Sequence, residues 1–196
     1  MGLKFKKPKA DTCFKCDKLK MQISMAKSDE EKNNLILQQS NHHKDTDVAF
    51  KMKETDKNLA KNNLNIKVYS FDLQQCLPTP LLTSNVCFYK RQLWTFNLTV
   101  HNCVSNIPFC YMWHEALAKR GGNEIASCIY QHLLSEPPNV NHVIFYSDGC
   151  VGQNKNSFMS AMFMVINFNF LYGYYFIILT FLISDIFAVP HKYSSY

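Results

Sequence analysis

The chain has 196 residues, of which 47% are hydrophobic and 18% charged, a composition that suits a globular protein and excludes a wholly disordered one. The length accommodates one domain with a modest core and an additional segment. The formal net charge of +6 is uneven: residues 1–61 hold 14 Lys against 9 Asp or Glu, whereas the remaining residues hold 7 basic and 6 acidic side chains. A basic leading segment suits a polyanion such as nucleic acid, and a solvated helical arm is the alternative.

The chain contains eight cysteines, and whether they form disulfides depends on whether the protein is secreted or stays in a reducing compartment. Residues 1–20 include seven Lys and no apolar run, so they do not look like a secretory signal peptide. We therefore expect an intracellular protein, nuclear if it binds DNA, whose thiols are free or metal-bound rather than paired in disulfides.

The first predicted segment, residues 1–62, is a basic arm that is expected to be helical after Cys16. Ser28 and Glu31 have the spacing of a capping box, which predicts that one helix ends and another begins near Lys27. The second of these helices carries a narrow apolar stripe. Such a stripe can pack against a domain or against a second copy of itself, so a homo-oligomer through the arm is one expectation.

The same arm carries a pair of cysteines, Cys13 and Cys16, with the spacing of half a tetrahedral zinc site. His42 or His43 could supply one further ligand, which gives three. The alternative is two unligated thiols in a basic segment. Three neighbouring lysines are expected to lower the pKa of both thiols, which favours metal binding and also oxidation. They are Lys15, Lys18 and Lys20.

The second predicted segment, residues 63–165, carries the strand signals. Residues 66–71 are β-rich, residues 86–89 form a short second candidate, and residues 94–100 alternate apolar and polar side chains as a half-buried strand does.

A helix is expected next, with Asn123 as its N-cap and apolar residues recurring every four positions, until Pro137 ends it. Residues 143–146 then predict a buried strand, and residues 158–165 another helix. The predicted order is β-β-β-α-β-α. Three meandering strands, a helix and a strand that returns beside the first are how an RNase H-like mixed sheet begins.

Acidic side chains stand at the ends of two of these strands. Asp72 closes the first strand, and Asp148 closes the strand after the helix. If the two strands are parallel neighbours, their backbones lie about 4.8 Å apart, so the two carboxylates could together bind Mg²⁺ or Mn²⁺. Glu124, in the first turn of the intervening helix, is the third predicted catalytic acid, with Glu115 as its competitor. Two such ions could activate a water or a 3′-hydroxyl. The alternative is that each acid is a turn or cap residue.

Five segments of the chain resemble, in sequence and in order, a family of uncharacterised, transposon-derived animal proteins. They are residues 5–17, 71–74, 89–93, 113–125 and 147–156. The resemblance implies an RNase H-like domain of the integrase or transposase type, in which Asp72 and Asp148 occupy the positions that look catalytic. Members of that family extend further at both ends, so the chain looks truncated and its sheet incomplete. Because the last acidic ligand is missing, we expect a domain for phosphodiester chemistry that is inactive as it stands.

Three basic residues are expected near the phosphates of a bound nucleic acid: Lys90, Arg91 and Lys155. DNA is accordingly the expected partner. A non-enzymatic remnant that binds DNA or protein is the alternative function.

The last predicted segment, residues 166–196, belongs to an apolar tail. Residues 156–184 are 29 positions without a charged side chain, longer than the roughly 20 that a bilayer span needs. One interpretation is therefore a tail-anchored membrane protein. A second is the translation of a retained intron, and a third is a buried helix followed by a strand at residues 174–182.

Overall fold

The structure is a computed structural model that describes residues 13–80, 90–169 and 176–181. The chain divides into two compact units, one comprising Met1–Phe50 with Ile183–Tyr196, and the other comprising Lys51–Leu182. This division falls within a long helix rather than at the predicted boundary between residues 62 and 63, because the last turns of that helix contact the sheet. Tyr146 donates a hydrogen bond to Asp56 there.

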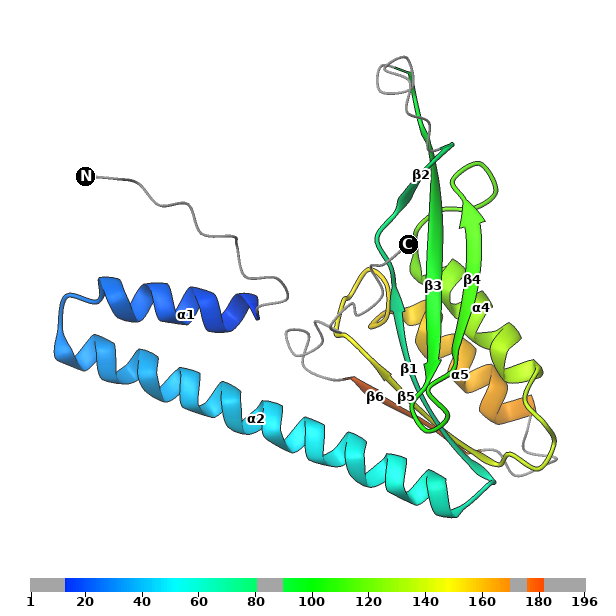
Figure 1. The fold of residues 1–196 in the computed structure, drawn as a ribbon, viewed down its shortest axis with the longest axis horizontal. Coiled ribbons are helices and arrows are strands. Elements are labelled where there is room, and N and C mark those ends of the chain that lie inside the picture. The colour runs from blue at the N-terminus through cyan, green and yellow to red at the C-terminus, as the bar shows by residue number, and fades with distance from the viewer. Residues whose placement is uncertain (1–12, 81–89, 170–175, 182–196) are drawn as a thin grey trace. The chain divides into compact units, whose positions relative to one another are not determined.

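The first unit is a pair of helices, α1 (Phe14–Met25) and the beginning of α2 (Asp29–Asn62), shown in blue and cyan in Figure 1. The break between them lies where the capping box predicts it. Ser28 Oγ accepts a hydrogen bond from the Glu31 backbone N–H at 3.2 Å, and Glu31 accepts one from the Lys27 N–H at 3.3 Å. The predicted helical arm is therefore two helices joined at a capped turn.

The second unit is an α/β fold built on a mixed sheet of six strands. Its elements in chain order are β1 (Ile66–Leu73), β2 (Leu77–Thr79), β3 (Leu93–Asn102), β4 (Pro108–His114), α4 (Gly122–Leu134), β5 (His142–Ser147), α5 (Ser157–Asn169) and β6 (Phe176–Phe181). The strand order is β2-β3-β1-β5-β6, with β4 paired on the other edge of β3. Strands β1, β5 and β6 are parallel, and β3 and β4 each run antiparallel to their neighbour.

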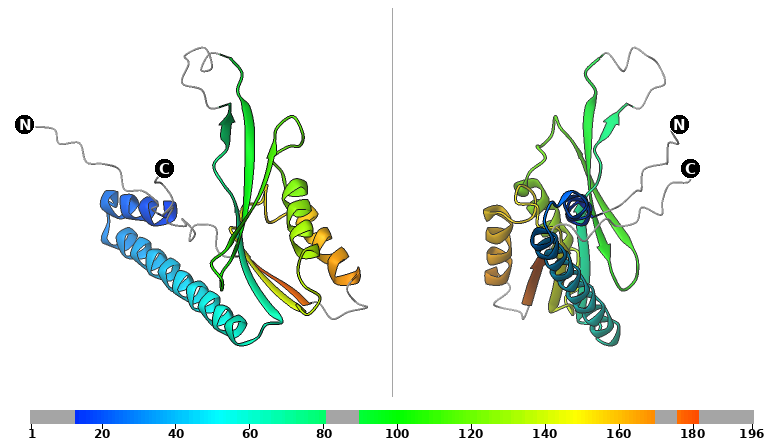
Figure 2. Two further views of the ribbon diagram at one scale, coloured as in Figure 1. Left: turned by 45° about the vertical axis from the view of Figure 1, so that its right-hand side comes forward. Right: turned by 90° about the vertical axis from the view of Figure 1, so that its left-hand side faces the viewer.

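Helices α4 and α5 lie side by side on one face of this sheet, as both views of Figure 2 show. The core forms between them and the strands, because alternate side chains of each strand point to that face. On β1 the core residues are Tyr69, Phe71 and Leu73, and on β3 they are Phe96, Leu98 and Val100. Trp94 lies on the same face as Phe96 by alternation along β3, but it is 42% exposed because it lies near the end of the strand, where β3 pairs with β2.

Two local predictions differ from the structure. Strand β4 is not among the predicted strands, because Trp113 is its one buried side chain and the segment shows no clean alternation. Helix α4 begins two residues earlier than expected, with Gly121 as its N-cap in place of Asn123. The strand predicted at residues 86–89 lies outside the described residues.

Part of the apolar tail belongs to the sheet. Residues Phe176–Phe181 form β6, which pairs in parallel with β5 along its whole length. Within the described parts of the chain, no helix is both long enough and apolar enough to span a bilayer.

Candidate functional site

Asp72 and Asp148 stand at the same level of two neighbouring strands. The parallel register of β1 and β5 pairs Ser70 with Tyr146, and two further residues along each strand lead to Asp72 and Asp148. Adjacent strands lie about 4.8 Å apart, so the backbones of the two aspartates are neighbours at one end of the sheet.

The loop after β5 fixes the carboxylate of Asp148. Its Oδ1 accepts a hydrogen bond from the buried Asn154 side-chain amide and another from the Cys150 backbone N–H at 3.3 Å. Both of these bonds engage Oδ1, so among the described residues Oδ2 is the oxygen that can turn to a ligand. The aspartate is thus a turn residue and a candidate ligand at the same time.

Glu124 does not join the two aspartates. Asp72 alternates with the core residues Phe71 and Leu73, so its side chain belongs to the face opposite α4. Glu124 lies in the first turn of α4, where it accepts a hydrogen bond from the Lys119 N–H at 3.2 Å. Among the residues that the structure describes, no trio of acidic, Cys or His ligands includes any of these three acids. The predicted three-carboxylate arrangement is therefore reduced to a pair.

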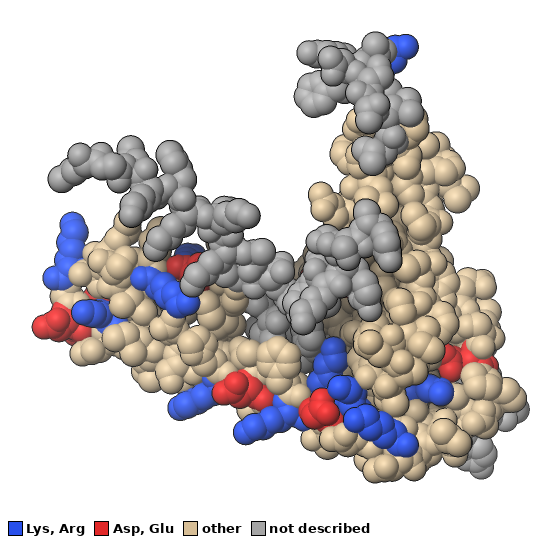
Figure 3. Space-filling view, in the orientation of Figure 1, with Lys and Arg blue, Asp and Glu red and all other residues tan. Residues whose placement is uncertain are grey.

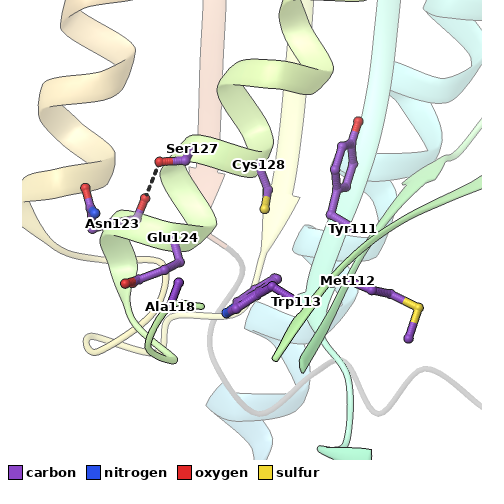
Figure 4. Close-up of a pocket in the computed structure, with 8 residues that line it drawn as sticks. All are labelled: Tyr111, Met112, Trp113, Ala118, Asn123, Glu124, Ser127 and Cys128. Atoms are coloured by element: carbon purple, nitrogen blue, oxygen red, sulfur yellow. Dashed lines mark hydrogen bonds between the residues drawn. The ribbon is translucent and has the colours of Figure 1, made fainter. Parts of the chain in front are cut away.

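Glu124 instead lines an open pocket of 360 Å³ between α4 and β4. Figure 4 shows it at the mouth of this pocket, with the Trp113 ring across from it and the Cys128 thiol further along the helix. The competing acid, Glu115, accepts a hydrogen bond from the Trp94 N–H at 3.3 Å and pairs with Arg91 at 3.5 Å. Both glutamates therefore have structural partners of their own.

The three predicted phosphate-binding residues lie in two places. Lys155 is exposed in the loop that carries Asp148. Lys90 and Arg91 are exposed just before β3, six or more positions along that strand from Thr99, the register partner of Asp72. At about 3.3 Å per residue, this separation is roughly 20 Å or more. Of these three residues, Lys155 is the one that shares a loop with Asp148.

The charge of the arm is mixed rather than uniformly basic. Residues 13–62 carry 10 Lys and 8 Asp or Glu, and Figure 3 shows both signs interspersed along α2. Three of the five excess positive charges of the leading segment therefore belong to residues 1–12, which lie outside the described residues.

The cysteines and histidines of the arm meet in one place, which we call the thiol–imidazole cluster: Cys13, Cys16, His42 and His43. Cys13 Sγ lies 3.3 Å from His42 Nε2, and Cys16 Sγ lies 3.5 Å from His43 Nε2. The donor atoms of Cys13, Cys16 and His42 all fall within 4.8 Å of one another, as a shared metal ion requires. The sequence reasoning allowed one histidine, and the structure brings both to the thiols.

The basic surroundings do not lower the pKa of Cys16, contrary to the prediction. Burial raises the pKa of this thiol, and the hydrogen bond and charge of neighbouring Cys13 raise it further. Lys20 acts in the opposite direction and is outweighed. Two thiols held side by side resist losing both protons unless a cation compensates the charge.

A buried polar network that the sequence reasoning missed lies beneath β4. His132 is 1% exposed, and its Nδ1 is 2.9 Å from the Tyr111 hydroxyl. Nearby, Tyr69 donates to Glu136. His132 belongs to a helix of ordinary amphipathic pattern, so only its position on the inward face of α4 could have indicated its burial.

Comparison of the chain with protein-family models, with curated proteins and with solved structures found no match.

Proposed function

We propose that residues 51–182 form an RNase H-like domain that acts on a nucleic-acid backbone, with Asp72 and Asp148 as its ligands for a single divalent cation. This proposal departs from the inactive domain expected from the sequence, because one cation held by two carboxylates needs no further acidic ligand from the chain. The strand directions support this proposal. Three parallel strands, β1, β5 and β6, are flanked by the antiparallel pair β3 and β4, and the crossovers from β4 to β5 and from β5 to β6 pass through α4 and α5. This is the arrangement that the resemblance to the transposon-derived family implies.

The observation that supports the proposal is the parallel register of β1 and β5, whose last pair is Ser70 with Tyr146; Asp72 and Asp148 each lie two residues beyond that pair, Asp148 in the loop that follows β5. Functional groups of open α/β sheets gather outside the carboxyl ends of neighbouring strands, because the loops there can be shaped freely. Asp148 meets this condition through a loop that binds one of its oxygens and not the other.

The donor set fits one hard cation rather than two. Mg²⁺ keeps several waters and is commonly held by one or two carboxylates together with substrate phosphates. Asp72 and Asp148 would hold it, and Lys155, exposed beside them, would contact the neighbouring phosphate. When bound, Mg²⁺ or Mn²⁺ would neutralise charge on the phosphodiester. Glu124, on the opposite face of the sheet, has no role in this proposal.

A nicking or strand-transfer assay on DNA and RNA duplexes with Mg²⁺ or Mn²⁺ tests the proposal, and two amide substitutions sharpen it. Asp148→Asn keeps an oxygen for the bonds from Asn154 and Cys150 but removes the charge, so activity should fall to background. Glu124→Gln is the matched control and should retain activity. Activity that survives Asp148→Asn, or its absence from the unaltered chain with either cation, contradicts the proposal.

For the thiol–imidazole cluster we propose zinc. Two thiolates and one or two imidazoles are the donors that Zn²⁺ prefers. Cations that prefer carboxylate oxygens, such as Mg²⁺, do not bind this set of donors. In this second candidate function the arm is a zinc-containing binding module for DNA or protein. The convergence of Cys13, Cys16 and His42 favours it. An electrophoretic shift of a DNA duplex by the whole chain, lost on chelation, would support this function, and a shift insensitive to chelation would contradict it.

A further inference from the structure

Two sulfur–nitrogen distances within the thiol–imidazole cluster match the distance between neighbouring ligand atoms of a tetrahedral zinc site. With Zn–S near 2.3 Å and Zn–N near 2.0 Å, a sulfur and a nitrogen on one tetrahedral zinc lie about 3.6 Å apart. The two measured separations, 3.3 Å for Cys13 with His42 and 3.5 Å for Cys16 with His43, are close to that edge length. Each thiol has its own imidazole, but the donors that all lie within 4.8 Å of one another are Cys13, Cys16 and His42, so the His43 ring would have to turn toward them to become the fourth donor.

The elements that supply these donors come from both helices. Cys13 is the N-cap of α1, and its Sγ accepts a hydrogen bond from the Cys16 N–H at 3.5 Å, which holds the two sulfurs in one tight turn. His42 and His43 lie 29 and 27 residues further along the chain from their sulfur partners, in the middle of α2. A metal ion at this point would therefore join the start of α1 to the middle of α2.

The helix pair has little else to hold it together. In its described portion, residues 13–50, the buried apolar side chains are Leu19 and Ala49 alone. Larger apolar side chains of α1 stay in solvent, including Phe14 at 75% and Met25 at 70% exposure. A unit of fewer than about 70 residues rarely gains enough stability from its hydrophobic core alone, and a disulfide, a metal or an oligomeric partner commonly adds the rest.

One imidazole is buried at the cluster without full compensation. His42 is 2% exposed, and its Nδ1 has no hydrogen-bond partner among the described residues. Its Nε2 points at the Cys13 sulfur, and a thiol is a weak hydrogen-bonding partner for a buried ring. Coordination of Nε2 to a cation would give that nitrogen a strong partner, while Nδ1 would keep its proton and stay without a hydrogen-bond partner among the described residues.

We propose that Cys13, Cys16, His42 and His43 together hold one zinc ion in a closed, four-coordinate site, and that this ion folds α1 onto α2. The inference rests on the zinc proposed above and adds the fourth ligand and the structural role. On binding, both thiols release their protons to solvent and bind as thiolates, while both imidazoles bind in the neutral form through Nε2. A site closed by four protein ligands leaves no position for a substrate, so its role is structural.

Metal analysis and cobalt substitution of the full chain test the proposal. We expect one zinc per purified chain, and a chelated chain that regains visible absorption of tetrahedral, thiolate-bound Co²⁺ when titrated with that ion. Cys13→Ser should abolish the absorption. Cys110→Ser, which alters an exposed thiol of β4, is the matched control and should leave it unchanged. Absence of both zinc and the cobalt absorption overturns the site, as does an unaltered spectrum in Cys13→Ser.

His43→Gln tests the fourth ligand separately. Loss of residues that merely support a ligand commonly weakens metal binding about 10- to 100-fold, so loss of a ligand should weaken Co²⁺ binding by at least about tenfold. His114→Gln, at an exposed histidine of β4, is its control. Unchanged affinity and spectrum in His43→Gln would overturn the four-coordinate assignment.

Hydrogen exchange on the full chain tests the folding role. Chelation should remove amide protection from α1 and leave β1 and β5 protected, and unchanged protection of α1 would overturn the folding role. These readouts are independent of the nucleic-acid assays, because they report on residues 13–50 without substrate. The experiments can therefore refute the zinc site without refuting the cation site at Asp72 and Asp148, and they can refute the cation site without refuting the zinc site.

Discussion

His132 is an ionisable side chain enclosed by aromatic rings. The rings of Tyr69, Phe109 and Tyr111 lie 4.6, 4.9 and 6.0 Å from its own, measured between centroids. Burial lowers the pKa of His132 to about 4, because a charged imidazole is poorly solvated among these rings. Glu136, whose Oε1 is 3.7 Å from His132 Nε2, favours the charged form but does not outweigh burial.

This shift predicts a loss of stability in mild acid. The ordinary pKa of histidine is 6.5. As the pH falls below that value, His132 becomes protonated in the unfolded chain but stays neutral in the folded chain, so protonation favours unfolding. The free energy of unfolding should fall between pH 6.5 and pH 4, by about 3 kcal/mol in all at 1.36 kcal/mol per pKa unit. Urea denaturation at several pH values measures it. His132→Phe should flatten this part of the profile relative to the unaltered chain, and identical profiles would count against the burial argument.

At the scale of elements, the starts of α4 and α5 are fitted to each other. A Cβ built on Gly122, at the first position of α4, would lie 2.3 Å from Asn156 Nδ2 and 2.6 Å from Oδ1. Asn156 cannot move away cheaply, because Oδ1 caps α5 by accepting from the Met159 N–H at 3.1 Å, and Nδ2 donates to the Val151 carbonyl at 3.3 Å. The absent side chain of Gly122 therefore makes room for the cap of the next helix.

Gly122→Ala should for that reason destabilise the sheet unit, although alanine is normally the better helix former. Displacing the Asn156 cap should lower the free energy of unfolding by about 1–3 kcal/mol. Chemical denaturation compares it with Gly152→Ala, whose added Cβ meets nothing within 4 Å and should change stability little. Equal effects of the two substitutions would show that the close contact with Asn156 does not matter.

At the scale of the whole molecule, β6 decides whether β5 is an edge strand. Strand β5 pairs with β1 on one side and with β6 on the other. Four of its residues, Val143–Tyr146, are buried and apolar or aromatic. An exposed strand of this composition would offer its unpaired backbone to other chains, which promotes aggregation.

Removal of residues 170–196 should therefore make the protein aggregate or lower its yield of monomer. Removal of residues 183–196 alone keeps β6 and is the matched control. Size-exclusion chromatography and light scattering of both shortened chains measure the difference. A monomeric, folded chain that lacks residues 170–196 would show that β6 is dispensable.

The sequence by itself determined the elements whose signals are local. Alternation in residues 94–100, the apolar run at 143–146 and the capping box at Ser28 lead to β3, β5 and the start of α2, because side-chain period and cap chemistry act within one element. The cysteine spacing at Cys13 and Cys16 likewise indicated a metal site before any contact was known.

Only the tertiary structure decided which of these residues meet. It separated Glu124 from Asp72, because the face to which a strand residue points depends on register across the sheet. It also brought His43 to Cys16 across 27 residues, a meeting set by how two helices pack and not by local spacing. Secondary structure and helix caps depend on residues that are close in the sequence. Contacts between residues that are distant in the sequence depend on how the whole chain packs.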